Sequence, residues 1–470
     1  MKLPIPDLLH VDARLSLDPE AVEELLELSF LGKEAAEGLD RSLSTPSRDG
    51  GWDASLFASD LFVHEIVRDT FRVEVDGVHF PVNIAFVQQV LTQPPTDAEG
   101  VRFRQDILRE LDENPRLLAA AESLYRDTAV LLDMFKSPDH AAQLDIDAYR
   151  LDIFRQTKRV VDRMASDFPD ASSGLSRLAE SGRAIHQSEH YLLLQNLLDY
   201  EGRQATLRVD VEIGADGEIH DLRLLNHEEN SANPLHVPLW KRLGLRLQAM
   251  VAGYRLSRKV LLQRLLQRIY DEVSPSLTPL VQVLGHLEIY LASRGFKNML
   301  ESRGYATSLA SVEEDAPSSL RSLINPLLLG NGEPAVACDV EVDARRSITM
   351  LTGPNSGGKT RLLQALGLAQ VLGQSGLYVP AASATLPLVR GLFVSLVETE
   401  SAHADEGRLG REMMRIKDVF TRVEAPAMVI LDELCSGTNP SEGIEIFSVV
   451  LRLLDRFDTS AYISTHFLDF

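Results

Sequence analysis

The sequence is short of cysteine, since only Cys338 and Cys435 occur in 470 residues. They form neither a Cys-x-x-Cys motif nor a Cys/His cluster, so no disulfide framework or zinc site is indicated. Long apolar runs are also lacking, because no uncharged stretch approaches the roughly 18 residues of a membrane span. Asp7 comes too early for a signal peptide. We therefore expect a cytoplasmic protein with no membrane partner.

Positive charge is scarce as well, with 47 basic against 69 acidic residues and a net charge of −22. Such a chain does not attract nucleic acid through its overall field, so any DNA contact must be local. One segment, Lys241 to Arg268, is basic and contains no acid. Four-residue spacing on a helix would place several of its cations on one face, either to bind phosphates or simply as a solvated helix face. These cations are Lys241, Arg242, Arg246, Arg255, Arg258, Lys259, Arg264 and Arg268.

Helical periodicity dominates from about Pro19 to about Arg303, as in Ala120–Phe135 and Leu243–Tyr270. Two interruptions, at residues 71–80 and 205–224, alternate like strands and are predicted to be β-hairpins.

The pattern changes after a turn-rich linker near Gly330, where short β-rich runs alternate with helices. Such alternation is typical of a parallel α/β sheet. We predict three parts: an N-terminal helical segment (1–59), a helical region with a hairpin near 205–224 (60–330), and an α/β domain (331–470).

A glycine-rich loop lies between the apolar run Ile348–Leu351 and the helical stretch Leu362–Gln374. Glycine suits such a loop because backbone N–H groups must turn inward and approach phosphates closely. Lys359 can then reach the β- and γ-phosphates of ATP, and the Thr360 hydroxyl is placed to bind Mg²⁺. The alternative is an accidental glycine-rich turn. The loop residues are Gly353, Pro354, Asn355, Ser356, Gly357, Gly358, Lys359 and Thr360.

Two further apolar runs end in residues suited to hydrolysis. Met428–Leu431 leads to Asp432 and Glu433, and a later run leads to His466. Asp432 is suited to hold Mg²⁺ through a water, and Glu433 to orient and deprotonate the attacking water. Because ligand contacts gather at the carboxyl ends of parallel strands, His466 is predicted to sense the γ-phosphate. The alternatives are a solvated acidic strand end and a structural histidine.

Together these motifs resemble the ATPase domain of the MutS family of DNA mismatch repair proteins. Thr352–Thr360, Asp432–Thr438 and Ser464–Phe467 match its recurring elements in order. The Gly-Gly-Lys-Thr form and the run Asn439–Gly443 are most similar to the shorter paralogues that lack a mismatch-reading domain. Weaker likeness extends into the helical part, at Leu91–Pro95, Arg104–Asp106 and Leu287–Ala292.

The resemblance implies an α-helical core and lever region with small β-hairpins, followed by a P-loop α/β ATPase domain of the ABC type. It implies ATP and Mg²⁺ as cofactors, with Lys359, Glu433 and His466 catalytic. Family cores dimerise with two ATPase sites at the interface, and the ATP state controls a clamp around DNA, so a homodimer through the ATPase domains is implied. The family continues beyond the position of Phe470 into strands and dimerising helices, so we expect a truncated C-terminal end.

Three departures from the family pattern bear on function. No Phe-x-Glu mismatch wedge occurs near the start, which puts specific mismatch reading in question. Ala335 stands where an aromatic would stack on adenine, so base stacking is expected to be weak or supplied elsewhere. Leu409 replaces the hydroxyl that a partner subunit offers to the γ-phosphate, which leaves Arg408 or Arg411 as substitutes.

The leading hypothesis is an ATPase that couples ATP binding and hydrolysis to clamp-like binding of mismatched or branched DNA in repair or recombination control. A ribosome-associated ATPase is the first alternative, because some short paralogues act on ribosomes. A nucleotide-gated, non-catalytic scaffold is the second, although the intact Glu433 argues against it.

Overall fold

The computed structural model describes residues 4–33, 38, 52–136, 145–201, 205–213, 219–229, 258–331, 334–354, 357–396, 408–434 and 439–465. The chain divides into two compact units. Unit 1 consists of Met1–Asp7, Arg14–Leu43 and Ala119–Leu284, and unit 2 of Leu8–Ala13, Ser44–Leu118 and Gly285–Phe470. Within the described ranges, no helix is both long enough and apolar enough to span a bilayer.

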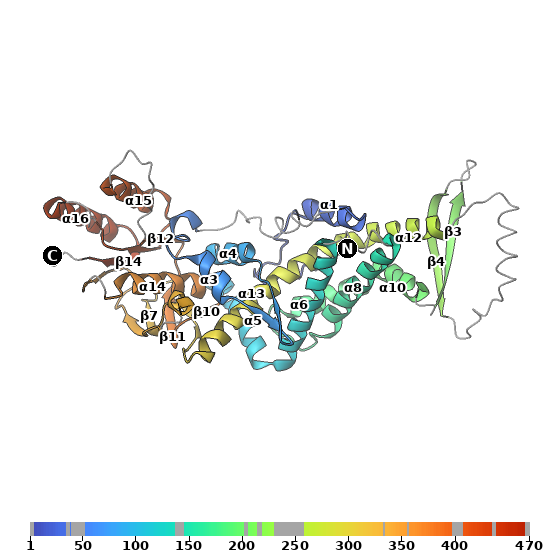
Figure 1. Ribbon diagram of the computed structural model, residues 1–470, viewed down its shortest axis with the longest axis horizontal. Coiled ribbons are helices and arrows are strands. Elements are labelled where there is room, and N and C mark those ends of the chain that lie inside the picture. Colours follow the sequence, from blue (N-terminus) through green and yellow to red (C-terminus); the bar gives the residue numbers. More distant parts are fainter. Residues whose placement is uncertain are drawn as a thin grey trace, which may run out of the picture. The chain divides into compact units, whose positions relative to one another are not determined.

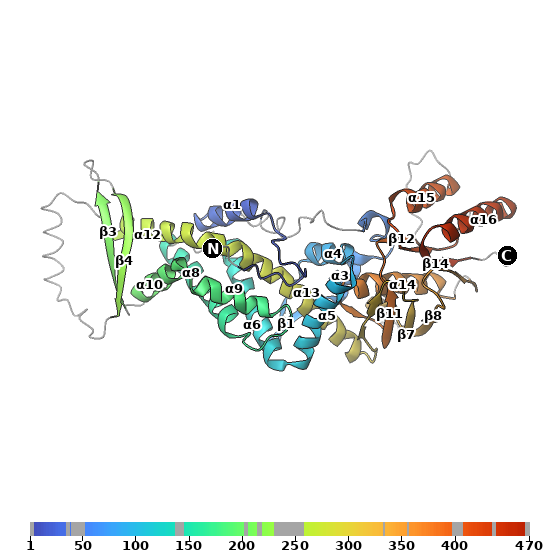
Figure 2. The same cartoon turned by 180° about the vertical axis from the view of Figure 1, so that it is seen from behind.

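Unit 1 is mainly helical, and Figure 2 shows its helices α8, α9, α10 and α12. Helix α8 is capped at its start by Asp145, whose side chain accepts hydrogen bonds from the backbone N–H groups of Asp147 and Ala148. A Cβ at Gly182 of α9 would lie 2.4 Å from the backbone nitrogen of Ala165, so glycine permits the close approach of α9 to α8. The helices are α1 (Pro19–Phe30), α6 (Pro115–Lys136, from Ala119 on), α8 (Ile146–Ser166), α9 (Ser176–His186), α10 (Glu189–Glu201), α12 (Arg258–Val273), the 3₁₀ turn η2 (Ser274–Ser276) and the start of α13 (Leu277–Ser302).

The sequence predictions for this unit are confirmed where they can be compared. Helix α6 covers Ala120–Phe135, and α12 covers the second half of Leu243–Tyr270, while residues 243–257 lie outside the described ranges. The hairpin predicted near 205–224 is present as antiparallel strands β3 (Ala205–Ile213) and β4 (Ile219–Glu229).

The described residues of unit 2 form helices, three small sheets and one parallel sheet (Figure 1). Its helices are α3 (Val63–Thr70), α4 (Ile84–Thr92), α5 (Ala98–Glu113), the rest of α13, α14 (Lys359–Gln374), α15 (Arg408–Arg422) and α16 (Pro440–Arg456), with 3₁₀ turns η1 (Ala54–Leu56) and η3 (Pro326–Asn331). The small sheets are β1 (Val73–Val75) with β2 (Val78–Phe80), β5 (Ser308–Leu309) with β10 (Tyr378–Val379), and β6 (Ser311–Glu313), β11 (Ser383–Pro387), β7 (Ser319–Leu323) and β8 (Cys338–Glu341) in that order. The antiparallel pair β1–β2 confirms the hairpin predicted at residues 71–80.

The parallel sheet has the order β12-β13-β14-β9, from β12 (Gly391–Ser395), β13 (Ala427–Leu431), β14 (Thr459–Ser464) and β9 (Ser347–Leu351). Side chains alternate between its two faces. Helices α15 and α16 cover one face, where Ile416 and Phe447 share an apolar core with Val429. Helix α14 covers the other face, where Gly367 approaches Ile430. Figure 1 shows strands β12 and β14 between these two helix layers.

Helix α14 is buried on nearly all sides and carries three buried glutamines. Gln364 donates a hydrogen bond to the backbone carbonyl of Asp60, and Gln370 donates to that of Pro387. Gln374 donates to the carbonyls of Pro95 and Val389 and accepts from the Val389 N–H. These directional bonds fix the helix both to the segment that follows it and to Asp60 and Pro95, which are far away in the sequence.

Helix α5 is joined to the same region by two polar side chains in the Arg104–Asp106 stretch. Arg104 is 3% exposed and donates to the carbonyls of Leu9 and Ser375, and Gln105 donates to that of Ala310. Unit 2 therefore includes residues from both sides of the linker near Gly330. The helical N-terminal region with small sheets is confirmed, whereas the boundaries at 59/60 and 330/331 stay predictions.

Candidate active site

The carboxyl ends of the parallel strands lie level with one another. Ser395 of β12 pairs with Leu431 of β13, and Ser464 of β14 pairs with Leu351 of β9. Beyond these ends, the Asp432 N–H donates to the carbonyl of Ser395, at 2.9 Å, and the Thr465 N–H to that of Leu351, at 3.0 Å. The phosphate loop after β9 and the acids after β13 thus leave the sheet at the same edge, which is where open α/β sheets bind ligands.

The described glycines of the phosphate loop have backbone conformations or close contacts that suit glycine. Gly353 has φ +147° and Gly358 has φ +81°, both in the region where a Cβ is unfavourable. A Cβ at Gly357 would lie 3.0 Å from the carbonyl oxygen of Pro354. Helix α14 begins at Lys359, directly after this turn and three residues earlier than the helical stretch predicted from the sequence.

Lys359, the first residue of α14, is 8% exposed. Its ammonium donates to the backbone carbonyls of Gly353, at 2.9 Å, and Pro354, at 3.1 Å. It also lies 3.9 Å from a carboxylate oxygen of Glu433. A buried cation held by neutral carbonyls and one partly exposed acid is suited to receive a polyanion.

Thr360 and Asp432 are brought together from positions 72 residues apart, because the Thr360 hydroxyl donates to the Asp432 carboxylate. A hydroxyl and a carboxylate are the oxygen donors that Mg²⁺ prefers in proteins, so these two residues fit the predicted ion. The structure therefore places Lys359, Thr360, Asp432 and Glu433 in one group.

Ser464 is a member of this group that the sequence analysis did not select. Its side chain is fully buried, and its hydroxyl donates to the second carboxylate oxygen of Asp432. The same hydroxyl accepts the backbone N–H of Glu433 at 2.9 Å. The sequence signal was weak, a small hydroxyl residue at the end of an apolar run two positions before His466.

Glu433 has an unusual backbone, with φ +49°. Residues other than glycine seldom occupy this left-handed region, and functional sites are where such strained positions cluster. The conformation turns the chain directly after Asp432, so the two adjacent acids leave the strand in different directions. Glu433 remains 34% exposed, while Lys359 beside it is 8% exposed.

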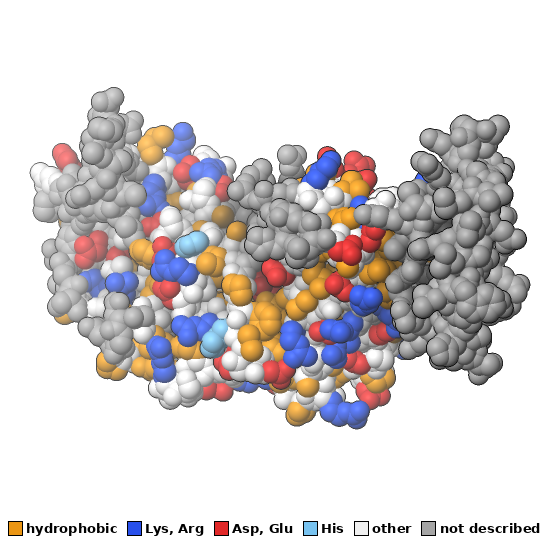
Figure 3. All heavy atoms as spheres, turned by 45° about the vertical axis from the view of Figure 1, so that its right-hand side comes forward, with side chains coloured by type: hydrophobic (Ala, Val, Ile, Leu, Met, Phe, Trp, Pro, Cys, Tyr) orange, Lys and Arg blue, Asp and Glu red, His pale blue; other side chains and the backbone are white. Residues whose placement is uncertain are grey.

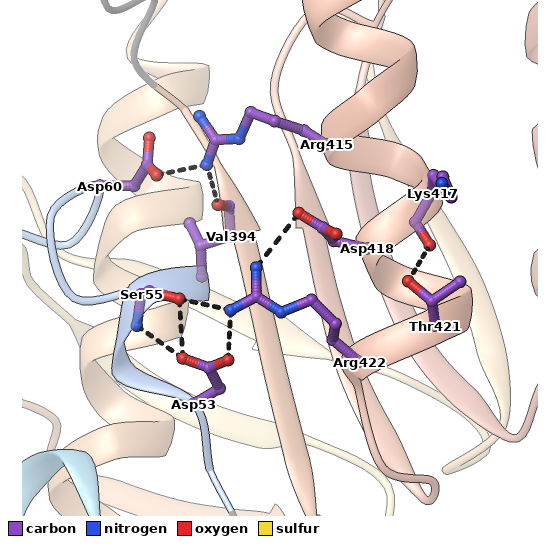
Figure 4. Close-up of polar contacts among 9 residues, drawn as sticks. All are labelled: Asp53, Ser55, Asp60, Val394, Arg415, Lys417, Asp418, Thr421 and Arg422. Carbon is purple, nitrogen blue, oxygen red and sulfur yellow. Dashed lines mark hydrogen bonds and ion pairs between the residues drawn. The ribbon is translucent and has the colours of Figure 1, made fainter.

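A second polar group lies near the site, on the segment before α3. Asp60 is 4% exposed and receives a hydrogen bond from the Leu396 N–H after β12. It also receives one from Arg415 of α15 (Figure 4). Arg415 also donates to the carbonyl of Val394. Since Gln364 of α14 donates to the Asp60 backbone, this aspartate contacts both helix layers of the sheet.

Some predicted residues lie outside the described ranges: Asn355 and Ser356 of the loop, the run 435–438, and His466. The backbone of Leu409 lies in α15, but the side chains of Arg408, Leu409 and Arg411 are outside the description. At the position expected to carry an adenine-stacking aromatic, the Ala335 N–H donates to the Tyr305 hydroxyl at 2.9 Å. A tyrosine from an earlier segment thus lies beside that position.

Basic side chains do not gather into a broad patch on the face drawn in Figure 3, where described lysines and arginines are interspersed with acids. Of the predicted basic segment, Arg264 and Arg268 lie exposed on α12. The part from Lys241 to residue 257 lies outside the described ranges.

Residues 349–470 match the model of MutS domain V. The chain is 27% identical over 317 residues to Endonuclease MutS2 of Streptococcus sanguinis, covering 63% of this chain and 38% of that protein. It is 31% identical over 214 residues to Endonuclease MutS2 of Thermomicrobium roseum, covering 44% of this chain and 27% of that protein. The chain thus spans well under half the length of these relatives. The resemblance to the MutS family, and to its shorter paralogues that lack a mismatch-reading domain, is confirmed.

Proposed function

Because the chain carries domain V of the MutS family, we propose that its C-terminal part binds ATP with Mg²⁺ and hydrolyses it. The observation that supports this most directly is the joining of Thr360 in the phosphate loop to Asp432 after β13. Phosphoryl transfer depends on positioning and charge neutralisation, and a loop with an adjacent acid pair supplies both.

Each residue has a role that follows from its place. Backbone N–H groups at the start of α14 face the β- and γ-phosphates, and Lys359 exchanges its carbonyl partners for phosphate oxygens. Thr360 and Asp432 would hold Mg²⁺, which when bound neutralises phosphate charge. Glu433 accepts a proton from the attacking water. At the same time the water oxygen forms a bond to the γ-phosphorus, and the bond between that phosphorus and ADP breaks. His466 is proposed to sense the γ-phosphate.

Replacing Glu433 with glutamine tests the hydrolytic step. We expect Glu433→Gln to lower kcat for ATP by about 10²- to 10⁴-fold, because the amide cannot take the proton, while ATP still binds. Steady-state phosphate release and equilibrium binding of a fluorescent ATP analogue measure the two effects.

Glu424→Gln is the matched control, since Glu424 is an exposed acid just before β13, at the opposite end of that strand, and pairs only weakly with Arg390. Equal turnover by Glu433→Gln and wild type would remove Glu433 as the base.

We also propose that ATP binding controls a clamp-like grip on mismatched or branched DNA by a homodimer formed through the ATPase domains. The relationship to the MutS family supports this proposal, and the exposed Arg264 and Arg268 of α12 offer local positive charge on an acidic chain. The relatives carry the name endonuclease, and we assign no nuclease step to the residues described above.

Binding to homoduplex, mismatched and four-way-junction DNA, each with ADP and with a non-hydrolysable ATP analogue, tests the clamp. We expect salt-sensitive affinity that changes with the nucleotide. Affinity that is equal with both nucleotides would contradict the clamp, and co-sedimentation with ribosomes in place of DNA binding would favour a ribosomal partner. Light scattering with each nucleotide tests the homodimer.

A further inference from the structure

We propose that Ser464 is a positioning residue for ATP hydrolysis, because its single hydroxyl fixes both members of the Asp432–Glu433 acid pair. This inference rests on the proposed ATPase function. The hydroxyl donates its proton to Asp432 and accepts the backbone N–H of Glu433, so it acts both as a donor and as an acceptor within the site.

The bond to Asp432 sets the orientation of that carboxylate. One oxygen accepts from Thr360 and the other from Ser464, so rotation about the side-chain torsion would break at least one bond. Groups that hold metal-binding side chains from behind fix their direction and increase their effectiveness. Ser464 therefore keeps Asp432 turned toward Thr360, in the direction needed for the ion.

The bond to Glu433 acts on the backbone. Residue 433 has φ +49°, a conformation that a glutamate does not favour by itself. The Ser464 hydroxyl accepts the N–H of this residue from a fully buried position on the neighbouring strand. Without that acceptor the strained turn loses one of the contacts that hold it, and the Glu433 carboxylate loses its fixed direction.

Strand β14 offers a matched control at its other end. Ser460 is also buried, lies on the same face of the strand as Ser464, and its hydroxyl donates to the carbonyl of Arg345. Ser460→Ala thus removes one buried hydroxyl and its hydrogen bond without touching the acid pair.

The test compares Ser464→Ala, Ser464→Thr and Ser460→Ala in the full chain. We expect Ser464→Ala to lower kcat by about 10- to 100-fold. Mg²⁺ strengthens the binding of a fluorescent ADP, and the Mg²⁺ concentration at which half of this effect is reached should rise by a similar factor. The KM for ATP should change little, because the phosphate loop is intact. Ser464→Thr keeps the hydroxyl and should restore most of both properties, whereas Ser460→Ala should lose thermal stability but keep wild-type kcat and Mg²⁺ dependence.

If Ser464→Ala and Ser460→Ala have the same kcat and the same Mg²⁺ dependence, the inference is overturned and Ser464 is a structural residue. If Ser464→Ala does not fold, Ser464→Cys gives the same test, because a thiol is a weak donor and acceptor; wild-type kcat in that variant would also overturn it. A wild-type protein without turnover would instead contradict the proposed ATPase function. The Mg²⁺ dependence of ADP binding would still separate Ser464 from Ser460 in that case.

Discussion

The two faces of the parallel sheet are joined to the rest of unit 2 by different kinds of contacts. On the α14 face, buried glutamines bond to backbone groups from residues 60, 95, 387 and 389. On the other face, α15 and α16 rely on apolar packing, and a groove of about 470 Å³ between them is lined by residues such as Phe420 and Ile446. Hydrogen bonds are directional whereas apolar contacts are not. The phosphate loop leads into α14 and is therefore attached to the face whose contacts are directional hydrogen bonds.

Removing the hydrogen bonds of one glutamine on the α14 face should lower the free energy of unfolding more than the other substitutions below. Gln374→Leu leaves the N–H and carbonyl of Val389 and the carbonyl of Pro95 without that partner in a buried place. We expect the free energy of unfolding to fall by about 3 kcal/mol, measured by urea denaturation.

The counterpart on the other face is Val449→Ala on α16, where the side chain is 48% exposed. This substitution should lower the free energy of unfolding by less than about 1 kcal/mol. Similar losses in the two variants would mean that the two faces do not differ as described.

The α15 face also carries polar contacts, of which the ion pair between Arg415 and Asp60 has the more buried acid (Figure 4). Arg415→Met should lower the free energy of unfolding by about 2 kcal/mol, less than for a fully buried pair because Arg415 is 32% exposed. Arg422→Met is the control on the same helix, since Arg422 is exposed and pairs with the exposed Asp53 and the half-buried Asp418, so its loss of stability should be much smaller than that of Arg415→Met. A larger loss of unfolding free energy in Arg422→Met than in Arg415→Met would contradict the view that the pair with the buried Asp60 contributes more.

A loss of stability smaller than that of Arg415→Met is expected at Asp112 of α5, which is held by directional bonds like those of the α14 face. Burial raises the pKa of Asp112, but hydrogen bonds from Lys297, Tyr378 and Arg294 outweigh it and leave the pKa below its ordinary value. Burial and the bond to Asp112 in turn raise the pKa of Tyr378. A lowered carboxyl pKa stabilises the fold above the ordinary value of 3.8, and this stabilisation is lost as the pH falls through the folded pKa.

Asp112→Asn should therefore lower the free energy of unfolding by about 1 kcal/mol at pH 7. Urea midpoints of variant and wild type should converge below about pH 4. A difference between the two that is constant over this pH range would show that the Asp112 charge contributes nothing.

Local patterns were enough to predict the parts of the site that are continuous in sequence. The apolar runs at 428–431 and 460–465 became β13 and β14, and the glycine pattern gave the turn that ends at Gly358. The helix start at Lys359 was missed because it depends on the left-handed Gly358, which periodicity does not report.

Long-range contacts could not be predicted in this way. The family motifs include both Ser464 and Asp432, but the local sequence does not show that their side chains meet, 32 residues apart, because that contact depends on β13 and β14 being neighbouring strands. Likewise, Asp60 was assigned no role, because its partners Leu396 and Arg415 are more than 300 residues away.

The left-handed backbone of Glu433 has a consequence for sequence redesign. A procedure that scores only how well each residue suits its backbone would replace Glu433 with glycine or asparagine, the residues that accept φ +49° most readily. The redesigned chain would gain stability and lose the carboxylate that faces Lys359. At this one position, the residue that best suits the backbone is therefore glycine, whereas the residue that the chemistry of the site requires is glutamate.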